Sequence, residues 1–207
     1  MKLETALAEC PVVAILRGVA PEEVLAHVDA LHGAGIRGVE VPLNSPEPLD
    51  SIRRVAEGFA GRMAVGAGTV LTAAQVDQVA AAGGRLIVSP NTRTEVIARA
   101  VELALDPAPG FATATEAFEA CAAGARHLKL FPASTYGPGH LRQLKAVLPP
   151  DAVVWAVGGV GPDSMADWWA AGARAFGLGG ELYRPGQTPG STAEKARRVV
   201  EAARALG

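Results

Sequence analysis

The chain has little cysteine, few aromatic residues and no long apolar run. Its two cysteines among 207 residues, Cys10 and Cys121, are too few for a disulfide framework and are not spaced as metal ligands. Aromatic residues make up 5% of the chain, and no segment is long and apolar enough to cross a bilayer. The first residues also lack the apolar core of a secretion signal. We therefore expect a cytoplasmic protein that does not associate with membranes.

A strong charge of either sign is also missing. The chain carries 19 basic and 21 acidic side chains, with a formal net charge of −2, which gives no reason to expect a nucleic-acid partner. No cluster of histidines or paired carboxylates stands at the end of an apolar run, so we expect no metal ion. With 49% apolar residues, this length favours one domain over residues 1–207 with a sizeable core.

Apolar runs of strand length alternate regularly with alanine-rich segments of helical periodicity. This alternation indicates an α/β protein with a parallel sheet, and the almost continuously apolar strands indicate burial on both faces. We predict strands at Val12–Leu16, Gly38–Val41, Met63–Ala67, Leu86–Val88, Ala108–Ala112, His127–Phe131, Val153–Val157 and Ala175–Leu178. We predict helices at Pro21–His32, Pro46–Phe59, Ala73–Ala82, Thr94–Leu103, Thr115–Ala122, Pro138–Val147, Pro162–Ala170 and Thr192–Leu206.

A short repeat supports a closed sheet. A tripeptide that begins with glycine and ends with arginine joins a helix end to a strand start at residues 35–37, 83–85, 124–126 and 172–174. The copies recur at intervals of about two βα units, so they introduce every second strand. Eight such units in one chain favour a (β/α)₈ TIM barrel. The chain is compact for a barrel, so an open sheet is the alternative.

Lysine is scarce, and one of the few lysines lies in the middle of an apolar strand, at Lys129. Burying a bare ammonium group is costly, so this lysine must be paired, neutral or reactive. Desolvation lowers the pKa of a lysine and makes its amine a usable nucleophile towards carbonyl carbon. The alternative is a lysine on an edge strand whose stem reaches water.

The repeat places an acid opposite this lysine. The position three residues after the arginine is Glu40 in the first copy and Lys129 in the third, while Val88 and Gly177 take it in the others. Equivalent positions on alternate barrel strands point inward in one layer. We therefore expect Glu40 and Lys129 to face each other, as a buried ion pair or as a catalytic pair. Both residues stand late in their strands, where barrel sites lie, which favours catalysis.

The other strand ends offer binding groups. Arg17 follows the first strand, and its planar fork suits a carboxylate. Thr69 follows the third strand with a hydroxyl, and small polar groups surround Pro90 after the fourth. Barrels commonly hold phosphate in glycine-rich loops after strands 7 and 8. Glycines stand in both loops here, at Gly158, Gly159, Gly179 and Gly180.

Five motifs together resemble the 2-keto-3-deoxy-6-phosphogluconate/phosphogalactonate aldolase family. They occur in the family's order between Pro11 and Tyr183: Ile15-Leu16-Arg17-Gly18, Gly38-Val39-Glu40-Val41, Gly66-Ala67-Gly68-Thr69, Lys129-Leu130-Phe131-Pro132-Ala133 and Val157-Gly158-Gly159-Val160. The resemblance implies a (β/α)₈ barrel, usually a homotrimer, that forms a Schiff base on lysine and needs no cofactor.

The same resemblance implies roles for individual residues. Lys129 is similar in position to the family's Schiff-base lysine and Glu40 to its general acid/base. Arg17 and Thr69 match the groups that hold the pyruvate end of the substrate, and the four loop glycines match the phosphate positions. Two further strand-end residues, Pro90 and Phe131, are expected to line the substrate site.

Within the family the chain is more similar to the phosphogalactonate branch. Asn44 lies in a motif typical of that branch, and Val157 stands where the sister branch tends to have threonine. Gly180 replaces a serine that is frequent in the family. The resemblance implies a class I aldolase that cleaves phosphorylated 2-keto-3-deoxygalactonate, with the gluconate epimer as the alternative. Two further functions fit the residues: a sugar-phosphate isomerase or epimerase with Glu40 as base, and a non-catalytic phosphosugar-binding barrel.

Overall fold

The computed structural model describes residues 1–206, in which strands and helices alternate along the chain. The strands are β1 (Val12–Ile15), β2 (Gly38–Pro42), β3 (Ala64–Gly68), β4 (Leu86–Val88), β5 (Asp106–Ala108), β6 (Gly110–Phe111), β7 (His127–Leu130), β8 (Val153–Val157) and β9 (Ala175–Leu178). The helices are α1 (Leu3–Glu9), α2 (Val24–Ala34), α3 (Pro48–Gly58), α4 (Ala73–Ala81), α5 (Thr94–Glu102), α6 (Ala114–Ala122), α7 (Ala133–Lys145), α8 (Met165–Ala170) and α9 (Pro189–Arg204), with the 3₁₀ turn η1 (Pro162–Ser164) before α8.

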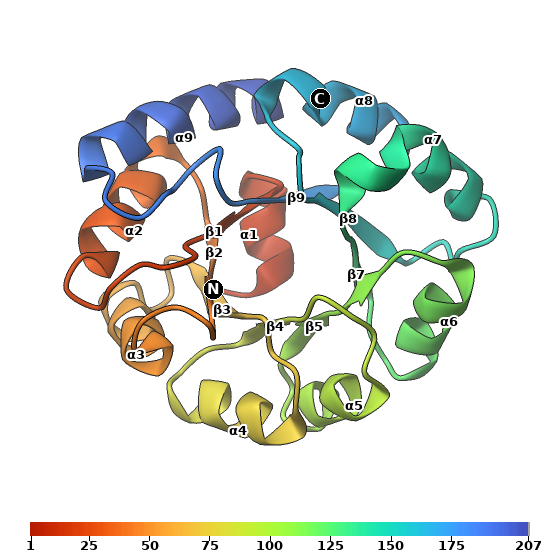
Figure 1. Cartoon of the computed structure of the whole chain (residues 1–207), viewed down its shortest axis with the longest axis horizontal. Coiled ribbons are helices and arrows are strands. Elements are labelled where there is room, and N and C mark those ends of the chain that lie inside the picture. The colour runs from red at the N-terminus through yellow and green to blue at the C-terminus, as the bar shows by residue number, and fades with distance from the viewer. Residues whose placement is uncertain (207) are drawn as a thin grey trace.

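The strands form one parallel sheet in the order β5-β4-β3-β2-β1-β9-β8-β7-β6. The sheet curls into a barrel inside a ring of helices, as Figure 1 shows in a view down the barrel. The α/β barrel expected from the strand–helix alternation is thereby confirmed.

The fifth predicted strand differs from the expectation for Ala108–Ala112. It begins earlier, at Asp106, and is divided at Pro109 into β5, which pairs with β4, and β6, which pairs with β7. Proline has no backbone N–H to donate to a sheet, so it interrupts the strand. Its carbonyl still accepts a hydrogen bond of 2.8 Å from the N–H of Lys129, so the segment between β5 and β6 remains attached to β7.

The repeated tripeptides have a common backbone role. Each begins with a glycine at positive φ within two residues of a helix end, where an L side chain is unfavourable, with φ of 115° at Gly35, 86° at Gly83, 102° at Gly124 and 110° at Gly172. The arginine that ends the tripeptide then begins the path into a strand. In the first copy the Arg37 Nη1 donates to the carbonyl of His32 at the end of α2, at 2.8 Å. The repeat therefore marks helix-to-strand turns.

Two apolar clusters hold the barrel. The larger lies between the sheet and the surrounding helices, and the smaller fills the barrel interior with side chains such as Val13, Val88 and Trp155. Leu3 and Ala6 of α1 belong to the smaller cluster and are fully buried. Helix α1 therefore closes the amino end of the barrel, a helix that the sequence patterning did not predict.

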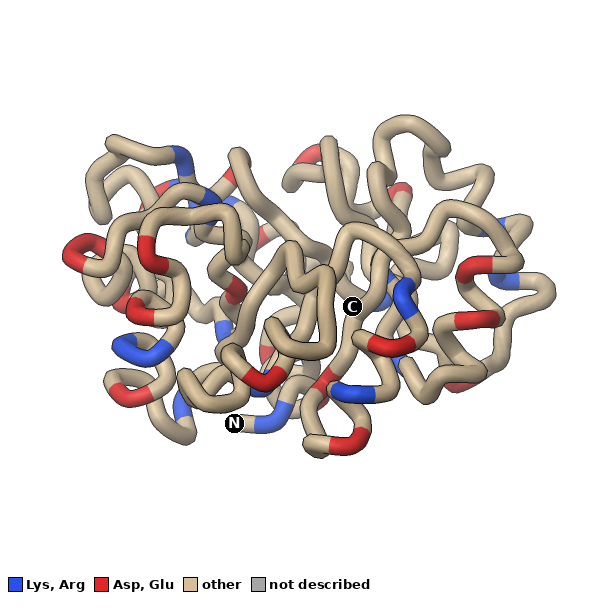
Figure 2. The backbone as a smooth tube through the Cα atoms, turned by 60° about the horizontal axis from the view of Figure 1, so that its bottom comes forward, with Lys and Arg blue, Asp and Glu red and all other residues tan. Residues whose placement is uncertain are grey.

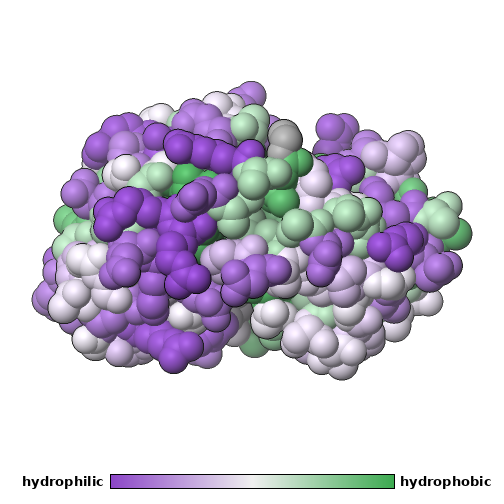
Figure 3. All heavy atoms as spheres, turned by 90° about the horizontal axis from the view of Figure 1, so that it is seen from above, coloured by the Kyte–Doolittle hydropathy of each residue, from purple (hydrophilic) through white to green (hydrophobic). Residues whose placement is uncertain are grey.

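The outer surface carries charges of both signs. Figure 2 shows the basic and acidic residues interspersed over the helical ring. Figure 3 looks onto the edge formed by α8 and α9, where apolar side chains show between hydrophilic surfaces. Over residues 1–206, no helix combines the length and the apolar character that crossing a membrane requires.

Candidate active site

The inner layer expected from the repeat is present. Glu40, Val88, Lys129 and Gly177, which share one position in the four copies, all line the same small cavity of about 10 Å³ inside the barrel. They come from β2, β4, β7 and β9, which are alternate strands of the barrel when β5 and β6 are taken as one. The side chains of Glu40 and Lys129 are therefore brought together in the interior, as the spacing predicted.

The carboxyl group of Glu40 is buried in a space that the neighbouring strand leaves open for it. Its side chain is 2% exposed, and its Oε2 atom has no hydrogen-bond partner among the described residues. The neighbouring strand makes room for it at Gly68, where a Cβ atom would lie 1.8 Å from Oε2. Burial raises the pKa of Glu40 to about 7, although the positive charges of Lys129 and Arg17 act in the opposite direction. The carboxyl group can therefore both give and take a proton near neutral pH.

Lys129 is 6% exposed, so its amine does not reach bulk water as an edge-strand lysine would. Its Nζ atom lies 4.7 Å from the centre of the Phe131 ring. Burial lowers the pKa of Lys129, Glu40 opposes this shift, and Arg17 adds to it. No ion pair within 4.0 Å joins Glu40 and Lys129 among the ion pairs of residues 1–206. The arrangement fits a nucleophilic amine better than a structural ion pair.

A larger cavity of about 460 Å³ opens beside Lys129 at the carboxyl end of the barrel. Eight of the predicted site residues line it: Arg17, Lys129, Phe131, Val157, Gly158, Gly159, Gly179 and Gly180. The lining also includes residues that the sequence analysis did not select: Ile15, Val160, Gly177, Glu181, Tyr183, Arg184 and Pro185. Most of the additional residues follow β9, in a loop where the sequence analysis considered only Gly179 and Gly180.

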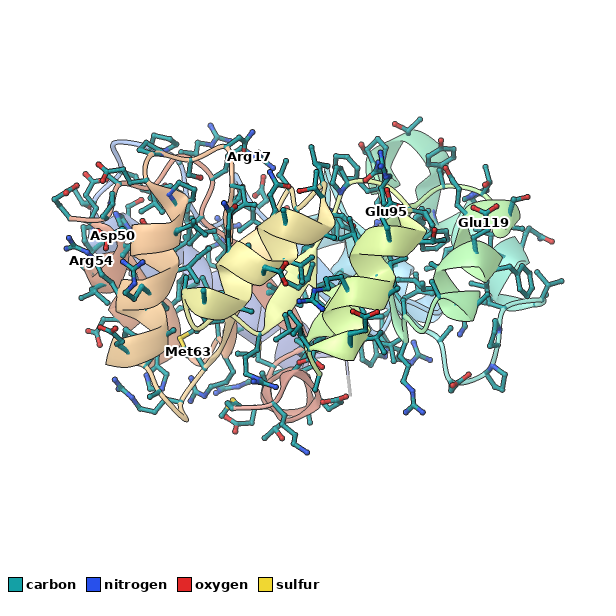
Figure 4. The ribbon with its side chains drawn as sticks, turned by 90° about the horizontal axis from the view of Figure 1, so that it is seen from below. Arg17, Asp50, Arg54, Met63, Glu95 and Glu119 are labelled. Atoms are coloured by element: carbon teal, nitrogen blue, oxygen red, sulfur yellow. The ribbon has the colours of Figure 1, made fainter. Side chains whose placement is uncertain are left out.

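Arg17 lines this cavity and is hydrogen-bonded to the predicted residue Asn44, which does not line it. The Arg17 Nη1 donates to Asn44 Oδ1 at 2.6 Å, and the backbone N–H of Gly18 donates to Ser45 Oγ at 2.9 Å. These two bonds join the loops after β1 and β2. Figure 4 shows Arg17 at the end of the barrel opposite to α1. The hydrogen bond to Asn44 thereby fixes the guanidinium group on the cavity wall, close enough for its charge to act on Glu40 and Lys129.

The glycine loop after β8 has a backbone that requires glycine. Gly158 and Gly159 have φ of 95° and 72°. A Cβ atom on Gly159 would lie 2.6 Å from the Cβ of Ser134, and the Ser134 N–H donates to the Gly158 carbonyl at 2.9 Å. The loop therefore packs against the start of α7 and leaves its backbone on the cavity wall. Glycine-rich loops of this kind suit an anion such as phosphate.

Two predicted residues, Thr69 and Pro90, lie at the same end of the barrel but do not line the larger cavity. Thr69 follows β3 with a φ of 57°, a conformation that few residues with a side chain adopt. Pro90 follows β4 and lies against β6, since a Cβ atom on Gly110 would be 2.3 Å from the Pro90 carbonyl oxygen. In residues 1–206, no three His, Cys, Asp or Glu side chains lie close enough together to hold a metal ion.

This geometry can be compared with known proteins. The family described as "Aldolase: KDPG and KHG aldolase" matches residues 3–190. The chain belongs to this family. It is therefore an aldolase, a carbon–carbon lyase, as the motifs predicted.

Two relatives and one solved structure cover between 81% and 95% of the chain of this aldolase. The chain is 50% identical over 194 residues to the 2-dehydro-3-deoxy-6-phosphogalactonate aldolase of Escherichia coli (strain K12), covering 94% of this chain and 95% of that enzyme. It is 30% identical over 169 residues to the KHG/KDPG aldolase of the same organism, covering 81% and 78%. The solved structure "Native KDPGal structure" superposes with a TM-score of 0.93 at 50% identity, covering 95% of each chain.

The room that Gly68 leaves for Glu40 predicts a position-specific effect on this aldolase. We expect Gly68→Ala to displace the Glu40 carboxyl group and to lower kcat at least about 100-fold, because a misplaced acid/base group loses most of its effect. Steady-state aldolase assays measure kcat, and thermal unfolding measures whether the variant is as stable as the wild type. Gly33→Ala is the matched control, since a Cβ atom there would meet nothing within 4 Å. Equal activity of the two variants would contradict the assignment.

Proposed function

We propose that this aldolase cleaves 2-dehydro-3-deoxy-6-phosphogalactonate reversibly to pyruvate and D-glyceraldehyde 3-phosphate through a Schiff base on Lys129. The observation that carries the proposal is the position of the Lys129 amine. It is buried next to Glu40 and opens onto the larger cavity. The substrate assignment is supported by the identity of 50% with a phosphogalactonate aldolase, against 30% with a KHG/KDPG aldolase.

The first stage of the proposed reaction makes the imine. Burial lowers the pKa of Lys129, which favours the neutral amine that attacks the keto carbon of the substrate. Loss of water then gives a protonated imine, with Glu40 passing protons to and from the departing oxygen. The fork of Arg17 holds the carboxylate, so that the keto carbon faces the amine.

The second stage breaks the carbon–carbon bond. Glu40 as the carboxylate takes the proton from the hydroxyl on carbon 4, and the bond between carbons 3 and 4 breaks. Its electron pair moves into the imine, which leaves an enamine on Lys129 and releases glyceraldehyde 3-phosphate. Protonation of the enamine and hydrolysis of the imine then give pyruvate and the free lysine. A pKa of about 7 suits Glu40 to both directions of proton transfer.

The remaining predicted residues are assigned to binding. The backbone of Gly158, Gly159, Gly179 and Gly180 on the cavity wall is proposed to hold the phosphate. Phe131 lies over the amine and limits its access to water. Thr69 and Pro90 follow β3 and β4 at the same end of the barrel, and we propose that they contribute to the pyruvate end of the site.

We also propose that the enzyme is a homotrimer, as the family resemblance implies. Large apolar side chains on α5 and α6, Val101 and Phe118, are each 45% exposed in the single chain, which supports an association of protomers. We expect light scattering on the purified protein to give three times the monomer mass. A monomer mass at micromolar concentration would contradict this.

Trapping with borohydride tests the Schiff base. We expect pyruvate plus borohydride to add a reduced adduct at Lys129, which peptide mass spectrometry locates among the other lysines of the chain. Lys129→Arg keeps the charge but cannot form an imine, so its activity should fall to background. Trapping elsewhere, or full activity of Lys129→Arg, would favour an isomerase or epimerase that uses Glu40 as base.

The two epimeric substrates test the branch of the family. We expect a kcat/KM at least about tenfold higher for phosphogalactonate than for phosphogluconate, because Val157 presents methyl groups where a threonine would present a hydroxyl to the substrate. Val157→Thr should narrow this ratio, since it changes polarity at nearly constant shape. A wild-type preference for the gluconate epimer would show that the assignment based on Val157 and Asn44 is wrong.

A further inference from the structure

The wall of the larger cavity carries an arginine to which the sequence motifs assign no role. Four charged residues line this cavity: Arg17, Lys129, Glu181 and Arg184. Arg17 and Lys129 belong to the reacting end described above. Arg184 comes from the loop after β9 and lies beside Gly180, where a Cβ atom would be 3.5 Å from the Arg184 Nε atom. It therefore stands beside the glycine loop assigned to phosphate.

The guanidinium group of Arg184 is held in place but remains available. Its Nε donates to the Gly180 carbonyl at 3.3 Å. In the part of the chain that the structure describes, Arg184 forms no ion pair, and its two terminal nitrogens have no hydrogen-bond partner. The nearby Glu181 does not neutralise it, since the Glu181 carboxylate lies against Gly161, where a Cβ atom would be 3.5 Å from Oε2.

A glutamine fixes the loop that carries this arginine. The Gln187 Oε1 accepts from the Arg184 backbone N–H at 3.1 Å and from Lys195 Nζ at 2.9 Å. Its Nε2 donates to the Leu182 carbonyl and to Thr192 Oγ1, each at 2.7 Å. These four bonds attach the loop to α9. The position of Arg184 is therefore set by the protein before a ligand arrives, which lowers the entropic cost of binding.

The two arginines of the cavity serve different ends of it. Arg17 lies close enough to the reacting pair to influence the pKa of both Glu40 and Lys129, whereas Arg184 is not among the causes of either shift. A sugar acid phosphate has an anionic group at each end of its carbon chain. The cavity has one guanidinium group near Lys129, that of Arg17, and a second on the wall beside the glycine loop, that of Arg184.

We propose that Arg184 binds the phosphate of the substrate by a charge-assisted hydrogen bond, in addition to the backbone N–H groups of the glycine loops. This inference rests on the proposed function. Arg184 then sets the preference of the enzyme for phosphorylated over unphosphorylated aldehydes. The chemistry is that of a guanidinium fork with a phosphate oxyanion.

The test compares two acceptors in the condensation with pyruvate: glyceraldehyde 3-phosphate and glyceraldehyde. We expect Arg184→Gln to raise the KM for glyceraldehyde 3-phosphate about 10- to 100-fold, the range for losing one charged hydrogen-bond partner. Its kcat/KM for glyceraldehyde should stay within about twofold of the wild type. Arg184→Lys, which keeps the charge without the fork, should lie in between. The exposed Arg198 on α9 does not line the cavity, so Arg198→Gln is the matched control.

The possible results separate this inference from the function on which it rests. An unchanged KM for glyceraldehyde 3-phosphate in Arg184→Gln overturns the inference, and so does an equal loss with both acceptors, which would indicate a structural role. Borohydride trapping of pyruvate at Lys129 in Arg184→Gln verifies that the reacting end is folded. A wild-type enzyme that does not condense pyruvate with glyceraldehyde 3-phosphate would instead overturn the proposed function.

Discussion

The site depends on the burial of an amine and a carboxyl group inside an apolar barrel without a direct ion pair between them. An ammonium ion or a carboxylate in such an interior is destabilised unless it is paired. Burial therefore lowers the pKa of Lys129 and raises the pKa of Glu40 to about 7. Burying the charged forms of these two side chains is unfavourable. The same cost favours the neutral amine, which is the nucleophilic form of lysine, and allows the glutamic acid to exchange protons at neutral pH.

The backbone around this pair is shaped to leave space. Gly68 of β3 lies where any side chain would overlap the Glu40 carboxyl group. Gly177 of β9 completes the inner layer, and a Cβ atom there would lie 2.8 Å from the Cγ2 atom of Val157 on the neighbouring strand β8. Trp155, next to Lys129 in the strand register, fills the interior towards the amino end. The result is a packed barrel in which the free volume lies at the carboxyl end, where the loops are free to carry binding groups.

The sequence predicted most of the barrel and the central pair, because both follow from periodic patterns. The glycine–arginine repeat placed Glu40, Val88, Lys129 and Gly177 in one layer, and the structure confirms this arrangement. Helix α1 was not predicted because it has only seven residues and no side-chain cap, and its role depends on the barrel that it closes. The contribution of Arg184 was also missed, although Gly179 and Gly180 of the same loop were predicted, because the position of a side chain in a loop follows no sequence periodicity.

Helix α1 has a consequence for the order of events in catalysis. Because it fills the amino end of the barrel, a ligand that reaches Lys129 comes through the larger cavity at the other end. Under the proposed Schiff-base mechanism, a chain-like sugar acid would enter with its keto acid end first, and the fragment nearer the mouth would depart before the fragment held on Lys129. In the direction of synthesis, pyruvate would then bind first and the aldehyde second. The closed amino end of the barrel thus favours an ordered mechanism for the proposed reaction.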